Sequence, residues 1–153
     1  MCGILAILNN RVLDDNTLRL LSSYINHRGS DYSSPLIKHN TKCGLELNLK
    51  SSVLHLRGDT MQTQPVIDKD HNVLMFNGQI YKFRNQEIPA KLADTSFLVD
   101  ELAKCKSKSE VAEIISHIDG PFALVYWHQR SKTFFYCRDV FGRKSLCLLR
   151  DIK

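Results

Sequence analysis

Residues 122–137 read FALVYWHQRSKTFFYC, two runs rich in aliphatic and aromatic side chains around a short polar stretch. Such runs favour strands, and the polar stretch between them favours a turn. We expect strands at Phe122 to His128 and Thr133 to Cys137, with the turn at Gln129 to Lys132. Strands joined by so short a turn pair in an antiparallel manner. This stretch therefore predicts an antiparallel sheet.

Strand patterns also occur on both sides of this hairpin. Asn77-Gly78 is the strongest short turn signal, because this dipeptide readily adopts the positive φ angles of a hairpin turn. Val73 to Phe76 and Ile80 to Phe83 flank it, which predicts a second hairpin. Asn9-Asn10 would close an earlier strand as a turn. The further segments with apolar or alternating patterns are residues 3–8, 44–49, 52–56 and 145–149.

Three helices are predicted from capping residues and from apolar spacing. Their capping residues are Asp14 or Asp15, Asp94 or Thr95, and Ser107 with Glu110, of which the last pair fits a capping box. We expect the first helix to end at Gly29. The inner faces are expected to carry Leu18, Leu20, Leu21, Tyr24 and Ile25, then Phe97, Leu98, Val99 and Leu102, then Val111, Ile114, Ile115 and Ile118.

The grouping of these elements indicates the fold class. Strands follow strands and helices follow helices, which favours antiparallel sheet layers with helices outside them over a doubly wound parallel fold. The chain has 153 residues and shows no internal repeat, low-complexity tract or linker. We therefore expect one α+β domain over residues 1–153.

Composition excludes several classes of protein. Apolar residues make up 43% and charged residues 24% of the chain, which is ordinary for a globular protein. Nothing approaches the roughly 18 consecutive apolar residues of a membrane span. The apolar run near the N-terminus is too short for a secretory signal. We therefore expect a cytoplasmic protein that has no membrane partner.

The net charge of +5 raises the alternative of a nucleic-acid partner. The basic residues are scattered, and the densest group, Lys104, Lys106 and Lys108, lacks the aromatic residues that stack bases. A solvated loop between two helices explains that group. We therefore expect no nucleic-acid partner.

Five cysteines occur, and none forms a Cys-x-x-Cys pair. Cys43, Cys105, Cys137 and Cys147 have no histidine at zinc-ligand spacing, so we predict no metal site. We expect these four residues to be small and buried, in a reducing compartment.

Cys2 differs because it follows the initiator methionine. Removal of Met1 would leave Cys2 with both a thiol and a free α-amine. A thiol titrates near ~8.5 and an α-amine near ~7.7–8.0, so the amine can take the thiol proton close to neutral pH. One residue then supplies both nucleophile and base. The alternative is a cysteine without function, buried in the first strand.

Three other positions suit the same chemistry. Asn77-Gly78 offers a side-chain amide beside an unhindered backbone N–H, as acyl transfer needs for its oxyanion, although the dipeptide alone is equally consistent with a plain turn. Arg57 and Asp94 could bind the carboxylate and ammonium of a free amino acid. Their alternatives are a surface charge and a helix cap.

Several short motifs follow one another along the chain: MCGI at the start, HRG at 27–29, QPV at 64–66, FNGQIY at 76–81, DGPFALVYW from Asp119 and RDVFGRKSL from Arg138. Taken together, these segments resemble the class II glutamine amidotransferase domain, the type found in asparagine synthetase. LHLRG at residues 54–58 and RDVFGRKSL look most similar to the asparagine synthetase domain-containing proteins.

The resemblance implies a fold and a reaction. The fold would be a four-layer α-β-β-α sandwich of two antiparallel sheets, the N-terminal nucleophile hydrolase type. Cys2 would attack the side-chain amide of L-glutamine while Asn77 and Gly78 hold the oxyanion. Ammonia would leave, and water would hydrolyse the glutamyl thioester to glutamate. No cofactor is implied.

The sequence departs from the family at three points, one of which concerns an implied substrate contact. Arg57 would hold the substrate carboxylate, and Asp94 its amino group. Gln79 stands where the family usually has a Glu that helps to bind the ammonium, so glutamine binding should be weaker unless Asp94 alone suffices. Ser30 replaces the usual Pro of the HRGPD loop, which removes a rigid φ but no reactive group. The loop between Arg57 and Gln64 is also shorter than in asparagine synthetase.

The nucleotide-binding SGG-x-DS loop of asparagine synthetase is absent from this sequence. The resemblance therefore implies an ATP-dependent asparagine synthetase-type domain or subunit as partner, and a role in asparagine biosynthesis. We expect either that Lys153 is a truncation point or that the partner completes the sheets. The alternative is a catalytically silent binding or regulatory module, for which Gln79 and the short chain are the evidence.

Overall fold

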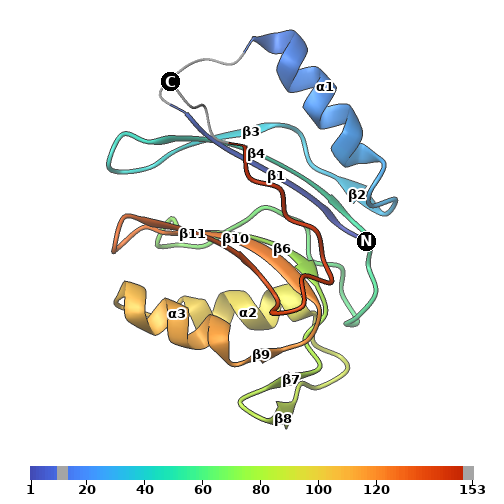
Figure 1. Cartoon of the computed structure of the whole chain (residues 1–153), viewed down its shortest axis with the longest axis vertical. Coiled ribbons are helices and arrows are strands. Elements are labelled where there is room, and N and C mark those ends of the chain that lie inside the picture. The colour runs from blue at the N-terminus through green and yellow to red at the C-terminus, as the bar shows by residue number, and fades with distance from the viewer. Residues whose placement is uncertain (10–13, 150–153) are drawn as a thin grey trace.

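A computed structural model of the chain describes residues 1–9 and 14–149 (Figure 1). Strand pairs within those ranges are antiparallel, and three helices accompany them. The predicted α+β class with antiparallel sheets is therefore confirmed. The turn predicted at Asn9-Asn10 extends outside the described residues.

Two four-stranded sheets and one three-stranded sheet form within the described residues. In the first sheet, β4 (Glu46–Val53) pairs with β1 (Gly3–Asn9) along one edge, and with β2 (Tyr32–Ser33) and β3 (Ile37–Asn40) along the other. The order of the second sheet is β11 (Thr133–Arg138), β10 (Phe122–His128), β6 (Val73–Gly78) and β5 (Val66–Ile67). In the third, β7 (Lys82–Phe83) lies between β8 (Gln86–Glu87) and β9 (Ile118–Asp119).

The hairpin predicted at residues 122–137 is confirmed as β10 and β11. The segments predicted at 44–49 and 52–56 form one strand, β4, which ends at Val53. Beyond Val53 the chain bonds to the loop after the first helix. The Asp31 N–H donates to the Val53 carbonyl at 3.0 Å, and the His55 N–H donates to the Asp31 carboxylate at 2.7 Å.

The hairpin predicted around Asn77-Gly78 is wrong. β6 continues through both residues, and the register pairs Asn77 with Ala123 and Gly78 with Phe122. Neither residue has the positive φ that the expected turn requires. Pairing with β10 outweighs the local turn preference, and the chain leaves β6 for a different sheet.

The strand predicted at residues 145–149 is also wrong. This segment pairs with no strand in the described part of the chain. Leu146 packs against the core, whereas Leu148 and Leu149 are exposed. Alternating apolar side chains indicate a strand only where a neighbouring backbone is available for pairing, and here none is used.

The helices are α1 (Asp15–Asn26), α2 (Asp94–Leu102) and α3 (Lys108–Ser116). Asp14 caps α1 and Ser107 caps α3 through side-chain hydrogen bonds to backbone N–H groups, as predicted. The cap predicted for α2 is wrong, because Ala93 is the N-cap and Asp94 lies within the first turn. α1 ends at Asn26 rather than Gly29.

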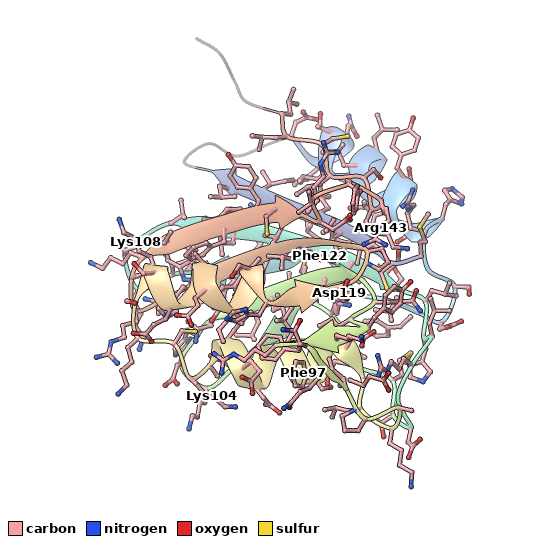
Figure 2. All side chains as sticks on the ribbon, turned by 60° about the horizontal axis from the view of Figure 1, so that its bottom comes forward. Phe97, Lys104, Lys108, Asp119, Phe122 and Arg143 are labelled. Atoms are coloured by element: carbon pink, nitrogen blue, oxygen red, sulfur yellow. The ribbon has the colours of Figure 1, made fainter. Side chains whose placement is uncertain are left out.

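Leu20 and Tyr24 project into solvent from α1 instead of facing the core. None of the helices in the described ranges combines the length and the apolar character needed to cross a membrane. Lys104, Lys106 and Lys108 are exposed around the link between α2 and α3, and Figure 2 shows Lys104 and Lys108 at the periphery.

The elements lie in layers in Figure 1. α1 covers the outer side of the first sheet, the two larger sheets face each other, and α2 and α3 cover the outer side of the second sheet. Alternate residues of β6 and β10 therefore enter two different cores. The core between the sheets contains Leu47, Leu49, Val73, Met75, Val125 and Trp127. The core beneath the helices contains Leu74, Phe76, Leu124 and Tyr126 with Leu98, Leu102, Val111 and Ile114.

We predict that Leu49→Ala lowers the free energy of unfolding by about 2–5 kcal/mol, because Leu49 is 0% exposed between the sheets. Leu20→Ala is the matched control, since Leu20 is 56% exposed on α1, and it should change the value by less than about 0.5 kcal/mol. Urea denaturation of both variants measures the difference. Equal effects would contradict the assignment of this core.

Candidate functional site

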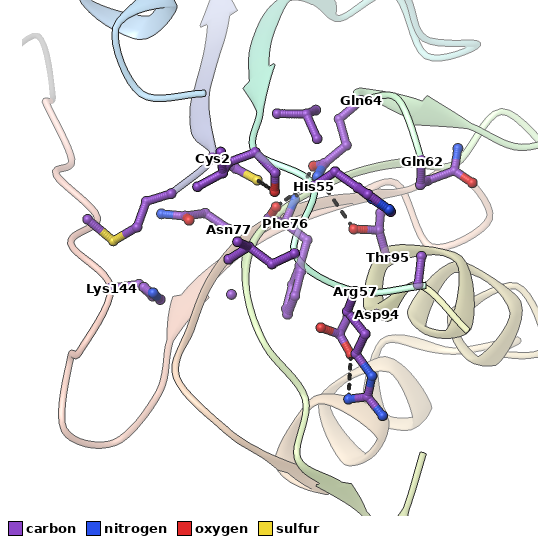
Figure 3. A pocket seen from close by; sticks show the side chains of 16 residues that line it. Cys2, His55, Arg57, Gln62, Gln64, Phe76, Asn77, Asp94, Thr95 and Lys144 are labelled. Atoms are coloured by element: carbon purple, nitrogen blue, oxygen red, sulfur yellow. Dashed lines mark hydrogen bonds and ion pairs between the residues drawn. The ribbon is translucent and has the colours of Figure 1, made fainter. Parts of the chain in front are cut away.

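A cavity of about 50 Å³ lies where the two larger sheets meet the start of α2 (Figure 3). It is lined by five residues that were predicted from the sequence: Cys2, Arg57, Asn77, Gly78 and Asp94. They come from four places in the fold: the residue before β1, the segment after β4, the end of β6 and the first turn of α2. Gln79 is not among the lining residues.

Because side chains alternate along a strand, those of Cys2 and Asn77 lie on the facing sides of the two larger sheets. Ile4 and Ala6 of β1 pack into the core between the sheets, so Cys2, two residues before Ile4, continues that row. Val73 and Met75 of β6 enter the same core, and Asn77 continues their row. The two polar residues thus occupy the ends of two apolar rows that face each other.

Cys2 is half-buried, and its thiol donates to the Leu54 carbonyl at 3.7 Å. The next residue must be small. A Cβ at Gly3 would lie 2.7 Å from the Ser52 Oγ and 2.9 Å from the Ile25 carbonyl oxygen. Close packing of the end of α1 against β1 and β4 therefore explains the Cys-Gly pair and fixes where the thiol lies.

Asn77 is only 4% exposed, and no hydrogen bond of its side chain is found in the described ranges. In Figure 3 its amide lies on the Cys2 side of the cavity, away from Arg57 and Asp94. Gly78 must also be small, because a Cβ there would lie 2.5 Å from the Pro121 carbonyl oxygen.

The N–H of Gly78 points away from β10. Its cross-strand neighbour is Phe122. The Phe122 N–H donates to the Asp139 carboxylate at 3.2 Å, and the Phe122 carbonyl accepts from the Asp139 N–H at 2.9 Å. Gly78 and Phe122 thus form a non-hydrogen-bonded pair, in which the backbone groups face outward from the ladder. β5 reaches only as far as Leu74 on that edge.

Arg57 and Asp94 bind each other at one end of the cavity. Arg57 Nη1 donates to the Asp94 carboxylate at 3.1 Å and to the Ile80 carbonyl at 2.6 Å, and its Nη2 donates to the Ile88 carbonyl. Burial raises the pKa of Asp94, and the nearby Arg57 guanidinium opposes that rise. The two sequence-predicted residues form a partly buried ion pair at the cavity wall.

Asp139 holds the turn after β11 against the strand that flanks Gly78. Its carboxylate accepts from the backbone N–H groups of Phe122, Phe141 and Arg143, and from Arg143 Nε at 3.2 Å. Burial acts to raise the pKa of Asp139, but these hydrogen bonds outweigh it and lower the pKa.

Sequence reasoning missed five further polar residues that line the cavity: His55, Gln62, Gln64, Thr95 and Lys144. Gln64 belongs to a motif used for the resemblance, yet nothing in its local sequence shows which backbone its side chain contacts. His55 and Lys144 lie in irregular segments, where no periodic pattern shows which way a side chain points.

The other cysteines and the acidic groups give no second site. Burial raises the pKa of the Cys105 and Cys137 thiols to about 11 in each case. Cys43 and Cys147 are exposed, contrary to the expectation that they are buried. Within residues 1–9 and 14–149, no group of His, Cys, Asp or Glu side chains gathers as a metal site would require.

The glutamine amidotransferase domain family matches residues 1–152 of this chain. The chain belongs to that family. Asparagine synthetase domain-containing protein 1 of Homo sapiens is 34% identical over 149 residues, 95% of this chain and 22% of the relative. The protein of the same name from Gallus gallus is 32% identical, over 95% of this chain and 23% of the relative.

A probable glutamine-hydrolysing asparagine synthetase of Dictyostelium discoideum is 28% identical, over 93% of this chain and 26% of the relative. The chain thus spans about a quarter of the length of these relatives. No solved structure gives a significant match. Membership of the family confirms the resemblance inferred from the motifs.

We predict that Asp139→Asn lowers the melting temperature near neutral pH, because an amide cannot accept all the hydrogen bonds that the carboxylate accepts. The folded pKa lies below the ordinary value of 3.8, so this stabilisation is present above pH 3.8 and is lost as the pH falls through the folded pKa.

Thermal melts of both proteins from neutral pH down to about pH 3 measure this effect. The gap in melting temperature should stay constant above pH 3.8 and narrow below it. A gap that is absent at neutral pH would show that the carboxylate does not hold the turn.

Proposed function

We propose that this chain hydrolyses L-glutamine to glutamate and ammonia, with Cys2 as its nucleophile after removal of Met1. The observation that carries the proposal is that one cavity brings Cys2, the residue before β1, together with Asn77 and Gly78 at the end of β6. We further propose that the layers in Figure 1 are the four-layer α-β-β-α sandwich of N-terminal nucleophile hydrolases.

The proposed reaction uses both the thiol and the α-amine of Cys2. Its thiol gives a proton to its own α-amine, and the sulfur attacks the side-chain amide carbon of glutamine. The C–N bond then breaks as the amine returns the proton to the leaving nitrogen, which gives ammonia and a thioester. Water adds next, again losing a proton to the amine, and the C–S bond breaks to release glutamate.

Asn77 and Gly78 are proposed to stabilise the oxyanion of both tetrahedral intermediates. The Asn77 amide lies on the Cys2 side of the cavity, and the Gly78 N–H points away from β10 at the end of the strand. Donors held in place before the reaction cost no reorganisation when the charge develops. Loss of one such donor typically costs ~10²–10³ in kcat.

Arg57 and Asp94 are proposed to bind the α-carboxylate and α-ammonium of glutamine. Within the described residues, Arg57 keeps its Nε–H and one Nη2 N–H without a partner, so it can still bind a carboxylate. Asp94 would share its charge between Arg57 and the substrate ammonium. Gln79 follows Gly78 directly, and we propose it as a weaker contact to that ammonium.

Met1 bears on both the chemistry and the space available. It lines the cavity and is 49% exposed, so an aminopeptidase can reach it. Its removal frees the α-amine of Cys2 and also enlarges the cavity. At about 50 Å³ the cavity is well below the roughly 300–1,000 Å³ of a typical small-molecule site, so the unprocessed chain leaves little room for glutamine.

The ammonia needs an acceptor, and the relatives suggest its type. Their names refer to asparagine synthetase, and each is about four times as long as this chain. We propose that an ATP-dependent asparagine synthetase-type domain or subunit uses the ammonia for asparagine biosynthesis in the cytoplasm.

A second candidate is an amidotransferase-like module that binds but does not turn over glutamine. The pairing of Arg57 with Asp94 favours it, because both proposed substrate-binding groups are engaged with each other. The two candidates differ in one respect: only the enzyme releases glutamate.

We predict that protein lacking Met1, as verified by intact mass, releases glutamate from glutamine and that Cys2→Ala abolishes this release. The thermal transition of the variant should stay close to that of the parent, because Cys2 is half-buried and lies before β1. Cys43→Ala is the matched control and should keep full activity, since Cys43 is exposed and outside the cavity. Absence of turnover in processed parent protein would favour the silent module.

We also predict that Gln79→Glu lowers the Michaelis constant for glutamine, because a carboxylate attracts the substrate ammonium more strongly than an amide does. Gln86→Glu provides the same change of charge on β8, outside the cavity, and should leave the constant unchanged. Steady-state kinetics of glutamate release measure both values. An unchanged constant in Gln79→Glu would remove residue 79 from the substrate site.

A further inference from the structure

Gln64 makes a two-point contact with the backbone of β6. Its side chain is 3% exposed, its Nε2 donates to the Phe76 carbonyl at 2.9 Å, and its Oε1 accepts from the Phe76 N–H at 2.6 Å. A side-chain amide that both donates to and accepts from one residue reproduces the hydrogen bonds of a neighbouring strand. Gln64 therefore extends the edge of the sheet with its side chain.

The position of this contact follows from strand register. Val66 of β5 pairs with Leu74. Two residues further along β6, the Gln64 side chain forms hydrogen bonds with the backbone of Phe76. Backbone groups of alternate residues point to the same edge of a strand. Gly78 is the next residue in that series. Its N–H points to the same edge of the strand, just beyond the positions that bond to β5 and to the Gln64 side chain.

Gln64 also connects the other elements around the cavity. Its backbone carbonyl accepts from the Ser51 hydroxyl on β4, which is the strand that pairs with β1 after Cys2. Its Nε2 lies 3.4 Å from the Thr95 hydroxyl, next to Asp94 on α2. The side chain and backbone of one buried residue thus link the strand that carries the oxyanion donors to α2 and to β4.

We infer that Gln64 is a positioning residue, which fixes the end of β6 so that Asn77 and Gly78 are held as oxyanion donors. The inference rests on the proposed glutaminase activity. Gln64 is not proposed to touch a reacting atom; it acts through Phe76, the residue just before Asn77. Loss of its two bonds would let the strand end move, and a displacement of about 1 Å can cost on the order of 10²-fold in rate.

Gln64→Met tests the inference, because methionine has similar length and removes both hydrogen bonds. We expect kcat for glutamate release to fall by about 10- to 100-fold, with the Michaelis constant nearly unchanged. Gln129→Met is the matched control: Gln129 is also a buried glutamine with a side-chain hydrogen bond, but it lies outside the cavity. It should keep the parent kcat when each protein is assayed well below its melting transition.

A double-mutant cycle separates positioning from a merely structural role. If Gln64 acts through the oxyanion donors, Gln64→Met should lower kcat far less in an Asn77→Ala background than in the parent. Equal fold-losses in the two backgrounds, or a parent-like kcat in folded Gln64→Met, would overturn the inference. No glutamate release from processed parent protein would instead refute the proposed function, and the inference would fail with it.

Discussion

The pairing of β6 with β10 is the constraint on which the rest of the structure depends. It fixes which residues of β6 enter the core between the sheets and which enter the core under α2 and α3. It also carries β6 beyond its apolar residues to Asn77 and Gly78, which therefore reach the cavity as strand residues. The site is thus a continuation of the core packing, with polar residues where the apolar rows end.

Much of this fold could be predicted from local sequence, namely the elements whose structure is determined by residues close together in the chain. The β10–β11 hairpin and the caps at Asp14 and Ser107 are of this kind. The predictions are wrong where the structure depends on pairing with a strand that is distant in the sequence. Asn77-Gly78 has a strong turn preference, but β10 offers it a pairing partner; residues 145–149 alternate as a strand does, but no backbone pairs with them.

The candidate site shows the same division. Residue chemistry alone was enough to select Cys2, Asn77, Gly78, Arg57 and Asp94, all of which line one cavity. Their partners were not predictable in this way. Arg57 meets Asp94 across 37 positions of sequence, and a pairwise contact of that kind leaves no periodic signal.

Gln64 is a clearer case, because it contacts backbone. Any residue other than proline at position 76 would offer the same N–H and carbonyl, so the identity of Phe76 does not reveal the contact. A motif can therefore mark such a residue as belonging to a family without showing what its side chain does.

The alternation along β6 also limits how the chain can change in length. Asn77 faces the first sheet because it is an even number of residues from Val73 and Met75, which do the same. Insertion or deletion of one residue between them would turn the amide to the helix side and bury it among apolar groups. Loops such as residues 59–63 can gain or lose residues freely by comparison. Length variation among homologous chains should therefore collect in the loops around the cavity and be absent from the strand that leads into it.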